Sequence, residues 1–364
     1  MNNNPIKINK WLQPLSILYG LGVNIRNKLY DWGVKKSHRF QLPIICIGNL
    51  TVGGTGKTPH TEFLVEVLKK RYKVAILSRG YKRSTKGFIL ADENSSASSI
   101  GDEPMQIAQK FPQAYVAVAE NRVEGVQKLS KLKEPPVEVV LLDDAFQHRR
   151  IKAGLNILLT DYNRLICDDA LLPAGRLREP LYAKNRAHIV IVTKCPDTIK
   201  PIDFNIVSKR LDLYPFQKLY FSCFKYKDLR PISPTSQQKK ISLSELKQDT
   251  KVLLVTGIAN PYTIKKELSK YIASVEEIHY GDHHNFTATD LKFIEKSFSK
   301  IKGDKKLIIT TEKDAMRLVE NPHLSKELKE AIYALPIQVE ILQNQENNFI
   351  QNILEYVRED KRDC

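Results

Sequence analysis

One segment constrains this chain more than any other: an apolar run, a glycine-rich turn and a Lys-Thr pair follow one another between Ile44 and Thr58. The run Ile44–Ile47 reads as a buried strand, and the residues after Lys57 have the pattern of an amphipathic helix. In phosphate-binding loops of this order, backbone N–H groups of the turn and of the helix N-terminus point at phosphate oxygens. The first glycine of the usual pattern is Thr51 here, but the flanking strand and helix are those that the motif requires. The sequence therefore predicts a site for a nucleotide triphosphate, ahead of the alternative of a glycine turn before an ordinary helix.

The same motif assigns tasks to single positions. Lys57 is placed to reach the outer phosphates, and the hydroxyl of Thr58 is suited to Mg²⁺. The residues assigned to the nucleotide are Thr51, Gly53, Gly54, Thr55, Gly56, Lys57 and Thr58.

An acidic pair, Asp143 and Asp144, follows the apolar run 139–142. A protein with a phosphate loop needs an acid at such a strand end, to hold Mg²⁺ directly or through water beside Thr58. A solvated turn is the alternative. Downstream of a phosphate loop we favour the metal site, and we leave open which aspartate binds the ion directly.

Runs with strand and helix patterns alternate along the first half of the chain. We expect helices at 59–70, 104–110 and 122–132, and strands at 74–77, 87–91, 115–119, 137–142, 155–160 and 188–193. This alternation predicts an α/β fold with a mainly parallel sheet and helices on both faces. Ligands of such sheets bind beyond the carboxyl ends of the strands, where the loops described above fall.

The pattern changes around residues 205–245, and a second, smaller α/β unit is expected to begin with a strand at 251–256 and to include another at 306–310. We therefore predict an N-terminal helical segment, a phosphate-loop domain, a linker and a second α/β domain that closes over the active site. Their expected bounds are 1–35, 36–210, 211–245 and 246–364.

The net charge of +16 is the strongest signal in the composition. It suits nucleic acid, an anionic membrane surface or a phosphorylated substrate, and does not choose among them. The five cysteines form no Cys-x-x-Cys pair, so neither a disulfide framework nor a zinc site is predicted.

Three further segments carry chemistry-bearing side chains. Ser78–Arg83 places cations after a strand, and Gly101–Pro104 places two carboxylates near a helix start, where Asp102 is alternatively a helix cap. Gly281–Phe286 is rich in histidine, and both a metal site and an orienting Asp282 beside a working histidine stay open. A fourth segment, Thr193–Asp197, is similar to the guanine-reading tetrapeptide of GTPases, but its spacing is wrong, which disfavours a GTPase.

Taken together, these segments resemble the lipid A 4'-kinase (tetraacyldisaccharide 4'-kinase) family. The resemblance rests on motifs in one order along the chain, namely Gly48–Pro59, Ser78–Tyr81, Gly101–Pro104, Asp143–His148, Leu172–Pro180, Thr256–Pro261, Asp282–His284 and Thr311–Ala315. Two departures are mild: Ala145 stands where glycine is expected, and Arg176 stands where proline is common.

The resemblance implies a kinase that transfers the γ-phosphoryl of ATP to the 4'-hydroxyl of an acylated glucosamine disaccharide 1-phosphate, with Mg²⁺. It implies Asp102 as the general base, with His283 or, second, His284 as its partner from the other domain, and Lys57 at the phosphates. We assign the metal to Thr58, Asp143 and Asp144. The residues assigned to the substrate are Arg79, Tyr81, Glu103, Arg122 and His148.

The N-terminal segment 5–32 combines Trp, Tyr and aliphatic residues with flanking lysines and arginines. Polar residues such as Asn24 and Arg26 interrupt the apolar ones, which argues against a spanning helix. A helix in the membrane interface and a helix packed on the core both fit, and the resemblance favours the first. We therefore expect a monomer bound peripherally to the cytoplasmic face of the inner membrane, without nucleic acid. The rival reading is a basic ATPase acting on nucleic acid, which would predict stacking aromatics on a basic face.

Overall fold

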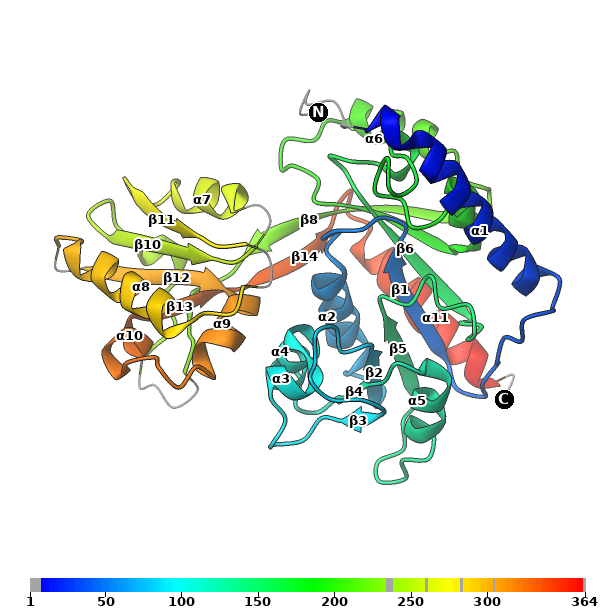
Figure 1. Cartoon of the computed structure of the whole chain (residues 1–364), viewed down its shortest axis with the longest axis horizontal. Helices are drawn as coiled ribbons and strands as arrows, with labels where there is room; N and C mark the ends of the chain where they lie inside the picture. The colour runs from blue at the N-terminus through cyan, green and yellow to red at the C-terminus, as the bar shows by residue number, and fades with distance from the viewer. Residues whose placement is uncertain (1–7, 234–237, 259–260, 282–283, 304, 363–364) are drawn as a thin grey trace. The chain divides into compact units, whose positions relative to one another are not determined.

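The computed structural model describes residues 8–233, 238–258, 261–281, 284–303 and 305–362. The chain forms two compact units (Figure 1). Unit 1 comprises the described residues of Met1–Glu93, Ile107–Phe224 and Val339–Cys364, and unit 2 those of Asn94–Gln106 and Lys225–Gln338.

The main sheet of unit 1 has the strand order β14-β8-β7-β6-β1-β5-β2-β4-β3 in the described part of the chain. Strands β4, β2, β5, β1, β6, β7 and β8 pair in parallel, whereas β3 runs antiparallel to β4. The strands are β1 (Ile44–Asn49), β2 (Val74–Ser78), β3 (Ile89–Leu90), β4 (Tyr115–Val118), β5 (Val139–Asp143), β6 (Leu155–Asp161), β7 (Ile189–Thr193), β8 (Lys218–Tyr226) and β14 (Ile337–Ile341).

Strand β1 shows why these runs form a central sheet: every one of its residues is buried. Ile44 and Cys46 enter one hydrophobic cluster, and Ile45 and Ile47 enter another, because alternate side chains of a strand face opposite sides. Helices cover both faces, as predicted: α5 and α6 pack into the first cluster, and α2 and α11 into the second. The helices of unit 1 are α1 (Gln13–Asp31), α2 (Lys57–Leu68), α5 (Arg122–Leu129), α6 (Pro201–Leu211) and α11 (Glu346–Arg362), with 3-10 turns η1 (Lys10–Leu12), η2 (Ile166–Asp168) and η3 (Leu181–Arg186).

Unit 2 is built on a second sheet, in the described order β11-β10-β12-β13-β9. Its pairs are parallel except β13 with β9. The strands are β9 (Arg230–Pro231), β10 (Lys251–Thr256), β11 (Val275–His279), β12 (Lys306–Thr311) and β13 (Ile332–Leu335). The helices are α3 (Ala97–Ile100), α7 (Tyr262–Leu268), α8 (Ala288–Lys300), α9 (Glu312–Val319), α10 (Lys326–Ala331) and the 3-10 turn η4 (Leu243–Glu245). Helix α4 (Asp102–Lys110) begins in unit 2 and ends in unit 1.

The fold class is confirmed, but the unit boundaries differ from the expected ones. The predicted linker 211–245 contains β8, whose residues Tyr220 and Phe221 are buried in the two clusters of unit 1. The predicted second domain 246–364 loses its end, because α11 buries Phe349 and Ile353 against unit 1. The run Lys218–Tyr226, inside the predicted linker, is therefore a strand of the main sheet.

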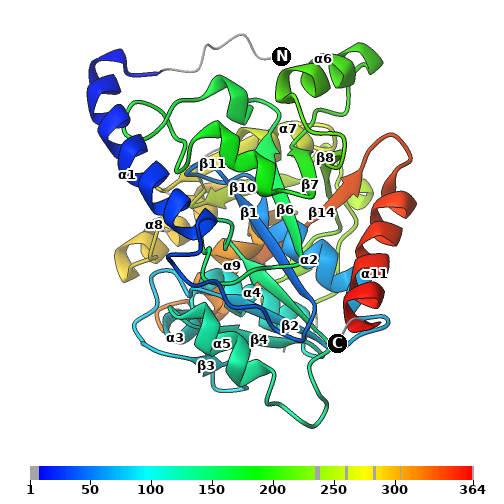
Figure 2. The ribbon, with the colours of Figure 1, turned by 90° about the vertical axis from the view of Figure 1, so that its right-hand side faces the viewer.

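Helix α1 lies along the outer side of unit 1 (Figure 2). Several of its large apolar residues are exposed to solvent. Ile17 is 71% exposed and Leu18 66%, and Trp11 in η1 just before the helix is 92% exposed. The buried residues of α1 are Ser16, Gly20 and Asn27. This is the reverse of the usual surface helix, which turns its apolar stripe toward the core. Among the described helices, none combines the length and apolar character needed to cross a bilayer.

Polar contacts hold α1 in place. The Ser16 hydroxyl donates to the carbonyl of Leu171 at 3.0 Å and accepts from the N–H of Ala174 at 2.9 Å. Tyr19 donates its hydroxyl hydrogen to the carbonyl of Arg178 at 2.9 Å. The helix therefore packs on unit 1 through its small and polar face. The structure thus shows α1 packed on unit 1, as one of the two readings from sequence expected, but with apolar side chains left exposed. The other reading, a helix in the membrane interface, stays a prediction.

Candidate active site

The glycine-rich loop connects β1 to α2 at the carboxyl edge of the main sheet. Gly53 and Gly56 have positive φ angles of 106° and 84°, which side chains other than glycine rarely adopt. A Cβ on Gly56 would lie 2.6 Å from the ring of Phe224. Glycine is therefore required in this loop for two reasons: the positive φ angles of Gly53 and Gly56, and the lack of room for a side chain at Gly56.

The acidic pair comes to this loop through the strand order. β5 is the parallel neighbour of β1, and Asp143 stands opposite Ile47 in the register. Asp143 is buried and accepts a hydrogen bond from the Thr61 hydroxyl at 3.0 Å, on the helix that follows the loop. The carboxyl ends of two adjacent parallel strands thus bring together residues 82 positions apart in sequence, at the place that the sequence predicted.

Asp144 lies between two cations. Its carboxylate is 3.7 Å from Nζ of Lys57 and 3.0 Å from a guanidinium nitrogen of Arg178. Burial alone would raise the pKa of the Asp144 carboxyl, but the charges of Lys57 and Arg178 outweigh it and hold that pKa below its ordinary value. Arg178 was absent from the predicted site residues. It lies in the segment Leu172–Pro180, and no local pattern singles it out as a partner of Asp144.

Two of the predicted substrate residues, the buried Arg122 and the half-buried His148, form a basic cluster near the acidic pair. Burial first, and then the charge of Arg79, lowers the pKa of Arg122 to about 10. Burial first, and then the charge of Arg122, lowers the pKa of His148 to about 4. Arg122 Nε and His148 Nε2 are buried without a hydrogen-bond partner in the described part of the chain. Unpaired buried polar atoms of this kind suit an anionic or hydroxylated ligand, and the Arg122 Nε–H is a donor for it.

Arg79 and Tyr81, in the loop after β2, are exposed, with Tyr81 at 66%. They lie at the same carboxyl edge as the phosphate loop, because β2 is the parallel neighbour of β5. This part of unit 1 thus carries an accessible arginine and tyrosine beside the basic cluster.

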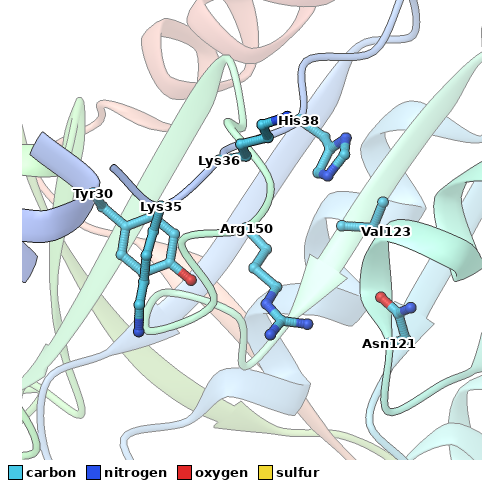
Figure 3. Close-up of a pocket in the computed structure, with 7 residues that line it drawn as sticks. All are labelled: Tyr30, Lys35, Lys36, His38, Asn121, Val123 and Arg150. Carbon is cyan, nitrogen blue, oxygen red and sulfur yellow. The ribbon is translucent and has the colours of Figure 1, made fainter. Parts of the chain in front are cut away.

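A pocket of about 350 Å³ opens in unit 1 beside the end of α1 and the start of α5 (Figure 3). In the figure, Tyr30 and Lys35 lie on one side of the pocket, His38, Val123 and Asn121 on the other, and Arg150 between them. The lining residues are Tyr30, Lys35, Lys36, His38, Asn121, Val123 and Arg150. Its composition favours anions over apolar molecules. None of these residues was predicted as a site residue, although the clustered lysines at 35 and 36 were part of the basic flank of the N-terminal segment.

Asp102 and Glu103 lie at the start of α4 and belong to unit 2. The prediction that Asp102 belongs to the phosphate-loop domain, with its histidine partner in the other domain, is therefore wrong, because residues 94–106 pack with unit 2. Nε of Arg317 donates to the Asp102 carboxylate at 3.0 Å, and the Glu103 carboxylate is 3.6 Å from Nζ of Lys313. Arg317 also lies 3.4 Å from Asp314. Sequence reasoning noted the segment Thr311–Ala315 but missed Arg317, which follows it by two positions.

Of the two candidate histidines, His283 lies outside the described residues, as does Asp282. His284 is engaged within unit 2: its Nε2 is 2.9 Å from the Asp290 carboxylate, and its ring stacks on Tyr280 at 4.4 Å between centroids. In the described part of the chain, no group of three or more His, Cys, Asp or Glu residues is arranged to hold a metal ion. The metal alternative for the histidine-rich segment thus has no support from its described residues.

Comparisons with known proteins cover nearly the whole chain. The family model for tetraacyldisaccharide-1-P 4'-kinase matches residues 8–358. A tetraacyldisaccharide 4'-kinase from Bacteroides fragilis is 59% identical, over 100% of this chain and 96% of the relative. The relative of the same name from Bacteroides thetaiotaomicron is 57% identical, over 100% and 97% of the two chains. The one from Porphyromonas gingivalis strain W83 is 44% identical, over 98% and 99%.

The solved structure of LpxK from Aquifex aeolicus in complex with ATP matches with a TM-score of 0.73 and 28% identity, over 96% of this chain and 99% of that one. Fold, motif order and sequence identity therefore agree along the full length. The resemblance inferred from the motifs is confirmed: the chain belongs to the tetraacyldisaccharide 4'-kinase family.

Proposed function

We propose that this protein is an ATP-dependent kinase that phosphorylates the 4'-hydroxyl of an acylated glucosamine disaccharide 1-phosphate, the precursor of lipid A. The observation that carries the proposal is the cluster at the carboxyl edge of the main sheet. There a glycine-rich loop opens α2, and Lys57 lies 3.7 Å from Asp144. Such a cluster serves to hold and neutralise a polyphosphate.

The proposed metal is Mg²⁺, and the side chains present suit it. Mg²⁺ prefers hard oxygen ligands and takes one or two carboxylates together with substrate phosphates. The Thr58 hydroxyl and the carboxylates of Asp143 and Asp144 are the oxygen donors next to the loop. When bound, Mg²⁺ neutralises charge on the β- and γ-phosphate oxygens. Lys57 adds a second positive charge to the same group.

The proposed reaction forms a bond between the 4'-oxygen of the sugar and the γ-phosphorus of ATP, and breaks the bond from that phosphorus to the β–γ bridging oxygen. ADP leaves, and the hydroxyl proton passes to the Asp102 carboxylate. His283 is the proposed dyad partner of Asp102. The engagement of His284 with Asp290 and Tyr280 supports that choice over His284.

The acceptor side rests on the basic cluster of unit 1. The buried, unpartnered atoms of Arg122 and His148 are proposed to bind the phosphorylated disaccharide, together with Arg79 and Tyr81. Glu103 is the proposed contact from unit 2. Because Arg122 keeps a pKa of about 10, it carries its charge at neutral pH.

Peripheral binding to the cytoplasmic face of the inner membrane is proposed from α1. Its exposed residues Ile17, Leu18 and Leu21 supply apolar area on one side, and basic residues such as Lys28 and Lys35 lie at its end. An amphipathic helix of this kind lies in the interface, with its charges toward anionic headgroups. The acylated substrate is itself a membrane lipid, so a docked enzyme meets it in place.

Incubation with γ-labelled ATP and an extracted acyl-disaccharide 1-phosphate tests the proposal, with the label then located on the product. We expect label on the 4'-oxygen with wild type and with Lys70→Ala, an exposed control on α2's trailing turn, but not with Lys57→Ala. Release of all label as inorganic phosphate would refute the kinase assignment. ATP turnover stimulated by single-stranded nucleic acid instead of the lipid would favour the rival reading.

A further inference from the structure

The peptide carbonyls of residues 53–56, on the phosphate loop, share one feature: each accepts a hydrogen bond from a side chain. The donors, in the order of the carbonyls, are Asn49 Nδ2 at 3.4 Å, Lys194 Nζ, Thr193 Oγ1 at 2.9 Å and His60 Nδ1 at 2.7 Å. They come from the end of β1, the end of β7 and the first turns of α2. All belong to unit 1.

Holding these carbonyls fixes the N–H groups as well. In a trans peptide the C=O of one residue and the N–H of the next point in opposite directions. The carbonyls of residues 53–56 point toward the side chains that bind them. The N–H groups of residues 54–57 therefore point in the opposite direction. In the described part of the chain, the N–H groups of residues 54–56 donate to no backbone or side-chain acceptor. They are left for a ligand, since an N–H without a partner is costly unless water or a ligand satisfies it.

The donors are themselves held. Asn49 and Thr193 are fully buried, and His60 is 2% exposed. Because the carbonyl of Gly56 only accepts, His60 Nδ1 carries the proton, and His60 Nε2 accepts from the Ser222 hydroxyl at 2.9 Å. Thr193 Oγ1 also approaches the carbonyl of Thr160 at 3.3 Å, a longer contact than the one to the loop.

Lys194 supports the loop from a special backbone position. Its φ angle is 57°, in the left-handed region, and its Nζ forms an ion pair with Asp161 at 2.8 Å. The Thr-Lys pair belongs to the segment Thr193–Asp197, whose similarity to a base-reading motif had no role in the function proposed above. In this structure the pair holds two successive carbonyls of the phosphate loop.

We infer that Asn49, His60, Thr193 and Lys194 are positioning residues that aim the N–H groups of residues 54–57 at the phosphates of the bound nucleotide. The inference rests on the proposed function in one respect, that the nucleotide is ATP. Loss of a positioning donor lets the loop turn its peptides toward water, so the cost falls on nucleotide affinity. The chemical step, which depends on Lys57 and the acceptor, is affected less.

The test uses Thr193→Val, which removes the hydroxyl and keeps the shape, and Thr193→Ser, which keeps the hydroxyl. Dissociation constants of ATP and ADP are measured by calorimetry without lipid, and KM and kcat for ATP with it. We expect Thr193→Val to weaken both nucleotides about three- to tenfold, the change for one hydrogen bond, and to raise KM for ATP with kcat within about twofold. Thr193→Ser should restore affinity.

Lys194→Met gives an independent arm, because Lys194 is partly exposed and its loss leaves the core intact. The controls are Thr250→Val, a buried threonine of unit 2 whose hydroxyl accepts from the N–H of Lys247, and the exposed Lys302→Met. ATP and ADP affinities unchanged within twofold in both Thr193→Val and Lys194→Met would overturn the inference. So would a loss confined to kcat. If both variants bind nucleotide more weakly than wild type, but wild type phosphorylates no acyl-disaccharide, the inference stands. That result would refute the proposed function alone.

Discussion

The pH dependence of stability follows from His60, the buried histidine behind the phosphate loop. Burial, reinforced by the charge of Lys194, lowers the pKa of His60 from 6.5 to about 4, against the opposing effect of its bond to Gly56. The unfolded chain therefore takes up a proton between pH 6.5 and 4 that the native protein does not. Stability contributed by neutral His60 is complete above pH 6.5, is lost as the pH falls, and is gone below about 4. At 1.36 kcal/mol per pH unit, the loss is about 3 kcal/mol.

The measurement is urea unfolding from pH 7.5 to 4 for wild type and His60→Asn. Asparagine can still donate to the Gly56 carbonyl but does not titrate, so the variant is destabilised by a constant amount. The free energy of unfolding of wild type, minus that of the variant, should fall by about 3 kcal/mol as the pH is lowered across this window. Taking the difference cancels other groups, including His148, whose pKa is lowered in the same direction. Parallel curves for the two proteins would refute the reasoning.

Three other outcomes are expected. Lys57→Ala should lower kcat about 10²–10³-fold at saturating ATP, because charge neutralisation acts mainly in the transition state; near-normal turnover in the labelled-ATP assay would contradict this. Asp102→Ala should lower kcat about 10²-fold or more with KM for ATP unchanged, and it should flatten the acid limb of the pH–rate profile. An unchanged profile would leave Asp102 as a partner of Arg317 only. Ile17→Glu should weaken co-sedimentation with anionic vesicles at least tenfold, while its free energy of unfolding stays within about 0.5 kcal/mol of wild type. The control Phe293→Glu, at a similarly exposed apolar residue on α8, should bind vesicles as wild type does.

The parts of the fold that local pattern dictates were predictable. The run Ile44–Ile47 and the glycines after it specify strand and turn by themselves, and Asp143 follows a strand whose parallel pairing brings it to the loop. Long-range partners could not be predicted, because no periodicity links Arg178 to Asp144 or Arg317 to Asp102. Strand β8 falls inside the predicted linker 211–245 for the same reason, since only tertiary packing shows that it belongs to the sheet.

Helix α1 shows a second limit. Its apolar residues are readable from the sequence, but which side of the helix is covered depends on contacts made by Ser16 and Gly20. Small and polar residues are weak signals in a sequence, and they decide here which face is buried. The remaining site assignments, including the dyad of Asp102 and His283 and the binding of Mg²⁺, stay predictions.

The exposed apolar face of α1 also affects whether the protein self-associates in solution. In aqueous buffer without lipid, the exposed side chains of Trp11 in η1 and of Ile17 and Leu18 in α1 are free to pack against the same face of another copy. We expect concentration-dependent self-association that mild detergent reverses. An oligomeric state measured without detergent would therefore reflect association through this exposed face in lipid-free buffer. The expected monomer is therefore to be sought in micelles.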